Sequence, residues 1–400
     1  MSESSGSPGT DPGTLPEPPE AAAEHGRRVV EHIGEAIDQA GGVIPFSRYM
    51  DLALYAPGLG YYSAGAGKFG EAGDFITAPD MSSLFSACVA GQCAEVLDRL
   101  GGGTVLELGA GSGAMAAGIL ERLDADGQLP EQYLILEVSA DLRQRQAATL
   151  EERVPDLAGR VRWIEDFPES LRGVIVGNEV LDALPVERFR IRGGAVRRLG
   201  VARGQQGFTW REMRHDQELA GRVRAIEDEL GRRVPEGYES ELCPAAAGLV
   251  RRAADSLQRG VVLFIDYGLP RREYYLPERR QGTLMCHYRH RAHGDPFVYP
   301  GLQDITAWVD FTGVAEAALA ADCELLGYTT QAHFLLGAGI DGLLARIDPD
   351  DTLMQLKQAQ EVKLLTLPGE MGERFKALAF ARGEGFRLSG FGFRDLRIQL

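Results

Sequence analysis

The distribution of apolar residues predicts strands that alternate with helices through the middle of the chain. Residues 104–120 read as a strand, a glycine-rich turn and a helix, residues 133–139 as a strand, and residues 140–153 as a helix. Further strands are predicted at 161–166, 173–180 and 260–268, and residues 174–176 form the continuous β-branched run expected of a strand buried on both faces. Alternation of this kind predicts an α/β protein with a parallel, doubly wound sheet.

Helical patterns also precede this alternating region. Apolar positions 29, 33, 36 and 37 predict a helix over 25–40 that two glycines end, and further helices are predicted after Pro45 and over 82–100. The intervening stretch YAPGLGYYSAGAGKFGEAGDFITAPD is too long and too rich in glycine for a routine connection. Loops of this kind are often functional.

An inserted segment separates the strands at 173–180 and 260–268. It contains a predicted hairpin, AVRRLGVARGQQGFTWREM, and the amphipathic helix ELAGRVRAIEDEL. Beyond the last of these strands, ITAWVDFTGVAEAALAADC reads as a helix, and the apolar stretches 327–336 and 375–382 could close the sheet as an antiparallel pair. We therefore expect a disordered tail over 1–24, N-terminal helices and a cofactor-covering loop over 25–100, a core over 101–192 and 260–386, and an inserted subdomain over 193–259.

The composition restricts the choice of partner and compartment. The net charge of −16 argues against a nucleic-acid surface and favours a protein, peptide or small molecule as partner. No apolar run approaches the ~20 residues that span a bilayer, and the N-terminus carries no signal pattern. Arginine outnumbers lysine by 38 to 4, which suggests a GC-rich bacterial genome, and we expect a cytoplasmic protein.

Polar residues follow the strand at 173–180. Asn178, Glu179 and Asp182 stand at its carboxyl end, the edge where open α/β sheets bind ligands. A helix cap is the alternative, because Asn178 could cap a short helix and Glu179 could favour its first turn. These residues alone do not decide between the two interpretations.

The motif VLELGAGSG contains the clearest ligand signal. Gly109, Gly111 and Gly113 allow a tight turn in which the backbone approaches a ligand at a helix N-terminus. Read as Gly109-x-Gly111-x-x-Ala114, the motif also satisfies the dinucleotide fingerprint, so a nicotinamide or flavin enzyme is an alternative.

Two acidic positions favour S-adenosylmethionine (SAM) over a dinucleotide, and a third gives weaker support. Glu107 can face the ammonium group of the ligand or its water shell, where a pyrophosphate would be repelled. Glu137, at the end of the second strand, can accept hydrogen bonds from both ribose hydroxyls. Asp166 suits the adenine amino group while Phe167 packs on the ring, although an acid followed closely by Pro168 is also a common turn.

Several stretches together resemble one family, the MidA-like SAM-dependent methyltransferases, whose members include a mitochondrial protein-arginine methyltransferase that assists respiratory complex I assembly. The matching segments are GDFITAPDMSSLF, VLELGAGSG, GNEVLDALPVERF, FIDYG, DITAWVDF and GYTTQAHFL. The resemblance implies a class I methyltransferase (Rossmann-like) core and, as for the mitochondrial relative, methylation of an arginine in a complex I subunit. Where the family usually has Glu and Pro, this chain has Asp80 and Ser83.

The resemblance gives roles to the polar residues. Asn178, Glu179 and Asp182 would face the acceptor, because carboxylates pair bidentately with a guanidinium and can take up the proton lost on methylation. It also implies a loop that closes over the cofactor, formed by Gly73, Asp74, Phe75, Thr77 and Pro79; a structural turn is the alternative.

The remaining patterns leave other functions open. His287, His290 and His293 suggest a metal site, but no ligand set is complete and the five cysteines contain no CxxC pair, so we expect no metal. A small-molecule or lipid methyltransferase on the same core, and a SAM-binding assembly factor without enzymatic activity, are the alternatives. The oligomeric state is open, with a homodimer as one arrangement.

Overall fold

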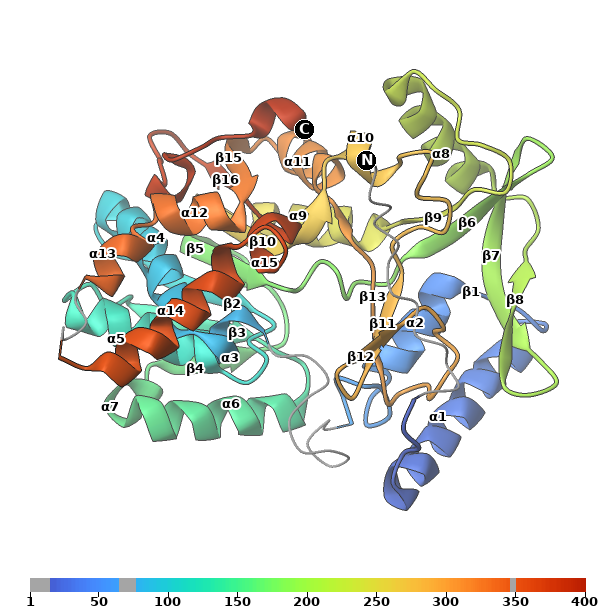
Figure 1. The fold of residues 1–400 in the computed structure, drawn as a ribbon, viewed down its shortest axis with the longest axis horizontal. Coiled ribbons are helices and arrows are strands. Elements are labelled where there is room, and N and C mark those ends of the chain that lie inside the picture. The colour runs from blue at the N-terminus through green and yellow to red at the C-terminus, as the bar shows by residue number, and fades with distance from the viewer. Residues whose placement is uncertain (1–14, 65–76, 346–349) are drawn as a thin grey trace. The chain divides into compact units, whose positions relative to one another are not determined.

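The computed structural model describes residues 15–64, 77–345 and 350–400 (Figure 1). By its internal contacts the chain forms two compact units. The core unit comprises Ile76–Asp182, Ala246–Arg271 and Val309–Leu400, and the accessory unit comprises Met1–Phe75, Ala183–Ala245 and Arg272–Trp308. These boundaries differ from the predicted segments because residues 83–100 belong with the core unit, whereas residues 272–308 belong with the accessory unit.

The core unit is built on a mostly parallel sheet. In sheet order its strands are β15 (Glu324–Thr330), β16 (Phe375–Arg382), β10 (Leu257–Leu269), β5 (Leu171–Asn178), β2 (Thr104–Leu108), β3 (Gln132–Leu136) and β4 (Val161–Ile164), and β14 (Val309–Asp310) pairs with the end of β10. The strands from β10 to β4 run parallel, while β16 is antiparallel to both β10 and β15. The predicted α/β class with a class I methyltransferase sheet is confirmed, as is the antiparallel closing pair.

The strand register brings several strand ends to one level. Leu108 of β2 lies beside Leu136 of β3 and Gly177 of β5, and Asn178 lies beside Ile265 of β10. The residues that follow these positions therefore lie along one edge of the sheet. This edge is where parallel α/β sheets bind ligands.

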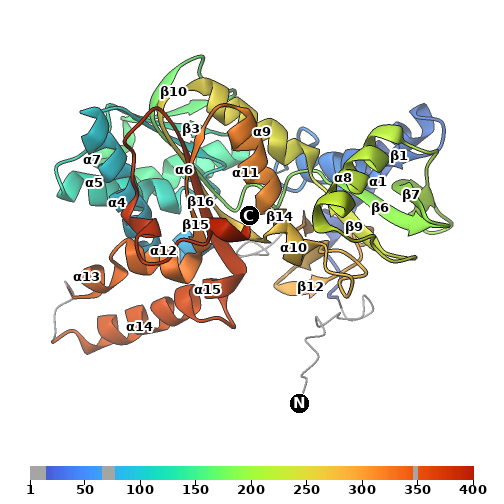
Figure 2. The ribbon, with the colours of Figure 1, turned by 90° about the horizontal axis from the view of Figure 1, so that it is seen from above.

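Helices cover both faces of this sheet. Figure 2 shows α4 (Ser83–Leu100) and α5 (Ala114–Ala125) on one side, and α9 (Pro244–Ser256) and α11 (Phe311–Ala320) on the other. Val105, Val176 and Leu263 share a buried cluster with Phe85 of α4 and Ile119 of α5. Burial on both faces explains why these strands read as continuous apolar runs. The predicted helix over 140–153 is observed as α6 (Ala140–Arg153), and the short α7 (Pro155–Ala158) follows it.

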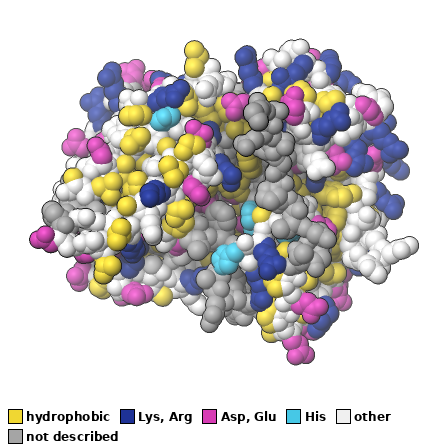
Figure 3. Space-filling view, in the orientation of Figure 1, with side chains coloured by type: hydrophobic (Ala, Val, Ile, Leu, Met, Phe, Trp, Pro, Cys, Tyr) yellow, Lys and Arg dark blue, Asp and Glu magenta, His cyan; other side chains and the backbone are white. Residues whose placement is uncertain are grey.

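The C-terminal part of the core unit contains α12 (Gln331–Gly337), α13 (Ile340–Leu344), α14 (Thr352–Thr366), α15 (Met371–Arg374), η3 (Ser389–Phe391) and η4 (Arg397–Gln399). Helix α14 exposes Leu353, Leu356 and Leu364. Apolar side chains gather in Figure 3 on the side that Figure 1 labels α12 to α14. Within the described ranges, no helix has the length and apolar character needed to cross a membrane.

The accessory unit contains two antiparallel sheets and several helices. Its five-stranded sheet is formed by β1 (Ile44–Pro45), β6 (Glu187–Arg192), β7 (Ala195–Arg203), β8 (Phe208–Glu212) and β9 (Glu239–Leu242), and its three-stranded sheet by β11 (Met285–Tyr288), β12 (Arg291–His293) and β13 (Asp304–Thr306). Ile33 of α1 (Glu20–Gln39) and Tyr49 of α2 (Phe46–Tyr55) share a buried cluster with Val201 and Ile305. The predicted hairpin is β7 and β8, and the predicted amphipathic helix is α8 (Gln217–Leu230).

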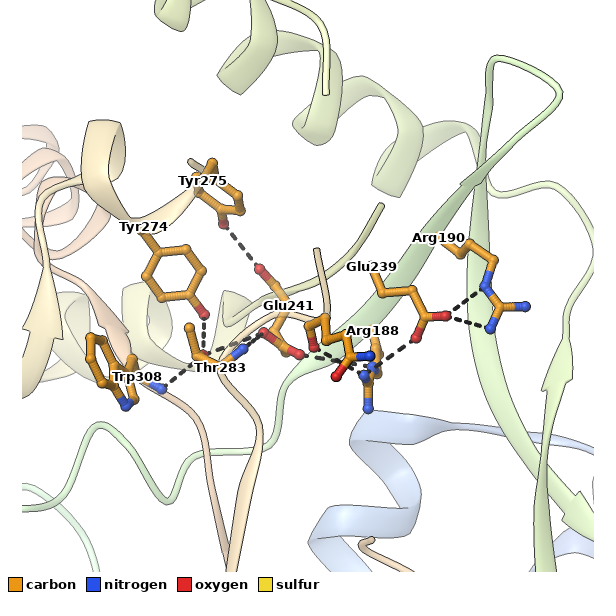
Figure 4. Close-up of polar contacts among 9 residues, drawn as sticks. Arg188, Arg190, Glu239, Glu241, Tyr274, Tyr275, Thr283 and Trp308 are labelled. Atoms are coloured by element: carbon orange, nitrogen blue, oxygen red, sulfur yellow. Dashed lines mark hydrogen bonds and ion pairs between the residues drawn. The ribbon is translucent and has the colours of Figure 1, made fainter. Parts of the chain in front are cut away.

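A buried polar network joins distant segments of the accessory unit (Figure 4). The Glu241 carboxylate accepts hydrogen bonds of 2.9 Å from the Thr283 amide and 3.3 Å from its hydroxyl. Arg188 lies 3.8 Å from Glu241 and 3.3 Å from Glu239, and Trp308 donates its amide to the Thr283 hydroxyl at 3.1 Å. Because a buried carboxylate is costly without partners, this network ties residues 272–308 to β6 and β9.

Three predicted elements differ from the structure. The helix predicted over 305–323 is wrong over residues 305–310, because Ile305 pairs with Cys286 and Val309 with Gly268, and α11 begins only at Phe311. Residues 331–336 belong to α12 and not to a strand. Helix α1 begins at Glu20, inside the predicted disordered tail, because Ala22 is buried in a cluster with Leu302; residues 1–14 lie outside the described ranges.

Candidate active site

The glycine loop leaves open space beside its backbone. Gly109, Gly111 and Gly113 connect β2 to α5 with φ angles of 60°, 53° and 87°, a left-handed conformation that L side chains rarely adopt. A Cβ at Gly111 would meet no heavy atom within 4 Å, whereas one at Gly113 would lie 3.0 Å from the Gln146 Cα. The loop is therefore packed closely against α6 at Gly113 and has room for a ligand at Gly111.

Glu107 points a carboxylate oxygen into a buried position. Oε2 accepts a 2.6 Å hydrogen bond from the Tyr133 hydroxyl, while Oε1 has no hydrogen-bond partner among the described residues. Burial raises the pKa of Glu107 to about 7, and the Tyr133 hydrogen bond opposes this shift. A buried, unsatisfied carboxylate oxygen suits a cationic ligand group or its water and would repel a pyrophosphate.

Glu137 follows β3 and is held by two neighbours. Its Oε1 accepts a 2.9 Å hydrogen bond from the Ser139 amide, and its Oε2 accepts a 3.2 Å hydrogen bond from Gln146 Nε2. Gln146 also donates a 3.2 Å hydrogen bond to the Gly111 carbonyl and accepts a 2.8 Å hydrogen bond from Trp163 Nε1. Because each carboxylate oxygen has a second lone pair, Glu137 can still accept from a pair of hydroxyl groups. Gln146 was missed by the sequence analysis; its only signal was a polar residue on the buried side of α6.

Asp166 and Phe167 follow β4, with Asp166 exposed and Phe167 half-buried. The Asp166 side chain is 74% exposed and forms an ion pair with Arg252. The Arg252 guanidinium also lies over the Phe167 ring, 5.1 Å from its centroid. Arg252 thus occupies the polar and aromatic surfaces that an adenine would use, and the adenine role remains a prediction.

The turn after β5 carries the predicted acceptor-facing residues. The helix-cap interpretation is wrong, because residues 179–184 form bends and turns that lead to β6 without an intervening helix. Glu179 has a φ of 52°, and its amide donates to the Ile265 carbonyl at 2.9 Å. The Glu179 Oε1 accepts hydrogen bonds of 3.1 Å from Asn178 Nδ2 and 3.4 Å from the Ala78 amide. The Asn178 Oδ1 is buried without a hydrogen-bond partner in the part of the chain that the structure describes.

The charges around Glu179 are negative. Burial raises the pKa of Glu179 to about 8, and the Asp182 and Asp80 carboxylates add to the shift. Asp266, at the end of β10, is fully buried beside this turn, and Glu179 in turn raises the pKa of Asp266. Two carboxyl groups with raised pKa values at a strand edge, Glu179 and Asp266, are typical of a functional site.

The predicted covering loop is described only in part. Gly73, Asp74 and Phe75 lie outside the described residues, whereas Thr77 precedes the short helix α3 (Ala78–Met81) and Pro79 is buried in it. Asp80 accepts a 2.7 Å hydrogen bond from the Thr77 hydroxyl and another from the Ser112 hydroxyl of the glycine loop. Helix α3 therefore contacts both the glycine loop and Glu179.

The three histidines belong to the accessory unit, whereas the described residues of this site belong to the core unit. His287 and His293 lie on β11 and β12 of the accessory unit, and His290 lies in the turn between these strands, with a φ of 60°. Burial lowers the pKa of both His287 and His293. Among residues 15–64, 77–345 and 350–400, no group of three or more His, Cys, Asp or Glu side chains could hold a metal ion.

Comparisons with known proteins agree with this geometry. Residues 88–329 match the family described as "Putative S-adenosyl-L-methionine-dependent methyltransferase". A crystal structure of a COG1565 superfamily member from Burkholderia thailandensis, bound to S-adenosyl-homocysteine, is 46% identical with a TM-score of 0.92, and the match covers 97% of this chain and 100% of that chain.

More distant relatives carry a more specific name. The mitochondrial protein arginine methyltransferase NDUFAF7 of Danio rerio is 28% identical over 388 residues, which cover 88% of this chain and 86% of that protein. Its Drosophila melanogaster homolog is 28% identical over 378 residues, 86% of this chain and 82% of that protein.

The described residues fit the cofactor of this family. The open space at Gly111 accommodates a ligand against the loop, and the unsatisfied Glu107 oxygen suits a ligand ammonium. Glu137 stands where it can accept from ribose hydroxyls. The chain therefore belongs to the family of SAM-dependent methyltransferases, and SAM is its cofactor.

Proposed function

We propose that the protein transfers a methyl group to the guanidinium group of an arginine in a partner protein. The observation that carries this proposal is the group of carboxylates Glu179, Asp182 and Asp80 beside the glycine loop. These side chains come from β5's end and from α3, both within the core unit. A cationic acceptor would neutralise charge that burial otherwise makes costly.

A guanidinium matches this site better than a point charge. Its planar fork of N–H donors pairs bidentately with a carboxylate, which fixes the direction of the nitrogen as well as its position. The unsatisfied Asn178 Oδ1 adds a neutral acceptor next to Glu179. Orientation of this kind contributes much of the rate of a transfer reaction.

The site also offers a proton acceptor. When bound, SAM supplies a methyl group on a positively charged sulfur. The guanidinium carries one positive charge before and after methylation, so its nitrogen must release one proton for each methyl group gained. Glu179, with a pKa raised to about 8, is a stronger base than an ordinary carboxylate and is placed to take this proton.

The names of the relatives support a protein as the acceptor. The Danio rerio and Drosophila melanogaster proteins are named as mitochondrial protein arginine methyltransferases. By family resemblance, the acceptor would be a subunit of respiratory complex I. We place the protein in the bacterial cytoplasm, consistent with its composition, where such a subunit would be accessible before assembly.

The proposal is tested with methyl-labelled SAM. The purified protein is incubated with labelled SAM and a lysate of source cells that lack the gene, and methylarginine is identified by mass spectrometry of the labelled proteins. Glu179→Gln keeps the side chain's shape and removes its charge, so we expect SAM affinity within about twofold and methyl transfer at least tenfold slower. Asp182→Asn should have a similar but milder effect.

Two outcomes would replace this function. Label found only in small molecules or lipids would favour the small-molecule or lipid methyltransferase. Binding of SAM without any labelled product would favour the assembly factor without enzymatic activity. Full activity of both variants on a labelled protein would show that these carboxylates do not hold the acceptor.

A further inference from the structure

One buried carboxylate that is not among the predicted site residues holds the turn that carries Glu179 and Asp182. Asp266 Oδ2 accepts hydrogen bonds from three consecutive backbone amides, Val180 at 3.1 Å, Leu181 at 2.8 Å and Asp182 at 3.3 Å. Its Oδ1 accepts 2.9 Å from the Tyr267 amide. A carboxylate with this many backbone donors is strongly held, and it holds the donors in return.

The turn needs such an anchor because Glu179 is in an unfavourable conformation. A left-handed φ of 52° costs a residue other than glycine about 1 kcal/mol or more, and it persists only when the surroundings enforce it. The Glu179 amide is fixed to the Ile265 carbonyl at 2.9 Å, and the three following amides are fixed to Asp266. Strand β10 therefore enforces the backbone from which the Glu179 side chain departs.

We propose that Asp266 is a positioning residue of the active site, which directs the Glu179 carboxyl group toward α3 by holding the amides of residues 180–182. This inference rests on the proposed role of Glu179. Asp266 itself is 1% exposed and contacts the acceptor only through the turn that it holds.

The Asp266 and Glu179 carboxyl groups are also electrostatically coupled. The titratable groups that face Glu179 are Asp182 on its own turn, Asp80 from α3 and Asp266 from β10. Burial raises the pKa of both Glu179 and Asp266, but four backbone N–H groups stabilise the ionised form of Asp266. Because like charges repel, an ionised carboxylate at position 266 opposes ionisation of Glu179, and replacing Asp266 with a neutral residue removes this repulsion.

The test compares Asp266→Asn with Asp310→Asn in the full chain. An asparagine at 266 has the same shape but is uncharged and has only one acceptor oxygen, so it cannot accept from both the turn amides and the Tyr267 amide, and its hold on the turn is weaker. Asp310 caps α11 and pairs with Arg271 at 3.1 Å, so its variant controls for the loss of another structural carboxylate. The readouts are the SAM dissociation constant, and the maximum rate, apparent KM for SAM and pH profile of label transfer to the gene-deletion lysate.

We expect Asp266→Asn to bind SAM within about threefold of the unmodified protein and to transfer methyl groups at least tenfold more slowly. Its rate should reach half-maximum at a pH lower by half a unit or more, because Glu179 loses a neighbouring negative charge. Asp310→Asn should keep the original midpoint. An unchanged rate and midpoint in folded Asp266→Asn, or an equal shift in Asp310→Asn, would overturn the inference.

Hydrogen exchange keeps the test valid if Asp266→Asn does not fold. In the unmodified protein, the amides of Val180, Leu181 and Asp182 should exchange slowly although they lie in a turn, and fast exchange would contradict the anchor. Glu179→Gln separates this inference from the proposed function. Full activity of Glu179→Gln removes the proposed function, whereas an inactive Glu179→Gln beside a fully active Asp266→Asn removes only the role of Asp266.

Discussion

The Tyr133 hydroxyl donates a 2.6 Å hydrogen bond to Oε2 of Glu107 and leaves Oε1 of the same carboxylate without a partner among the described residues. Burial raises the pKa of Glu107 to about 7, and the Tyr133 bond favours its ionised form. Tyr133→Phe should raise this pKa further, so that less Glu107 is ionised at neutral pH. If Glu107 faces the ammonium of SAM, affinity for SAM should fall at least threefold at pH 6.5.

The pH dependence distinguishes this effect from a general loss of packing. Because both proteins approach full ionisation of Glu107 as the pH rises, the difference in affinity should shrink at pH 8. Calorimetric titration with SAM at both pH values measures it. Equal affinities of Tyr133→Phe and the unmodified protein at pH 6.5 would show that Glu107 does not interact with the cofactor's charge.

The sequence predicted the sheet well because its strands are buried on both faces. Residues 174–176 read as a continuous β-branched run for this reason, and the rule that ligands lie at strand ends led directly to Glu179. Residues 305–310 were wrongly predicted as helix, because their pairing with Cys286 and Gly268 is determined by segments distant in the sequence. Local patterns carry no information on such pairing.

The same limit applies to the site. Glu107, Glu137 and Glu179 were found because each is adjacent to a strand end or a glycine motif. Asp266 and Gln146 were missed because each matters through the groups to which it is hydrogen-bonded. Asp266 accepts hydrogen bonds from three turn amides, and Gln146 donates hydrogen bonds to Glu137 and to the Gly111 carbonyl. The sequence contains Asp266 in the segment FIDYG, but only the fold shows from which amides this carboxylate accepts hydrogen bonds.

Gly111→Val should abolish SAM binding. A Cβ at Gly111 meets no protein atom within 4 Å, so the added side chain would fill space that a ligand needs. Gly127→Val is a matched control, because Gly127 also has a left-handed φ, 66°, and open space around its Cβ, but it lies at the other end of α5. Both variants carry similar backbone strain. Calorimetry should detect SAM binding only for Gly127→Val, and normal binding by a folded Gly111→Val would contradict the position of the cofactor.

Glu137→Ala should weaken SAM binding more than tenfold, or by ~1.4 kcal/mol, because it removes the acceptor for two ribose hydroxyls. Glu165→Ala provides the comparison, since Glu165 follows the neighbouring strand β4 but its side chain is 78% exposed and pairs with Arg143 at 3.3 Å. The affinity of Glu165→Ala for SAM should stay within twofold of that of the unmodified protein. A decrease of less than twofold for Glu137→Ala, measured by the same titration, would show that another group holds the ribose.

Glu179→Gln should make the protein more stable at alkaline pH although it impairs catalysis. The pKa of Glu179 is raised from 4.5 to about 8, so between these values the folded protein binds more protons than the unfolded chain. The free energy of unfolding must therefore fall as the pH rises through this window. A glutamine does not titrate, and its variant escapes this loss. Since Glu179 is only half-buried, we expect a gain of about 1 to 2 kcal/mol at pH 8.5, and a clearly smaller gain at pH 5, close to the lower end of the window. Chemical denaturation at the two pH values measures the difference. Glu169→Gln, on an exposed loop, is the control that should show no pH-dependent gain.

If Glu179→Gln gained no stability at pH 8.5 relative to pH 5, Glu179 would be an ordinary carboxylate that ionises at acidic pH. Its role as the proton acceptor would then lose its physical basis.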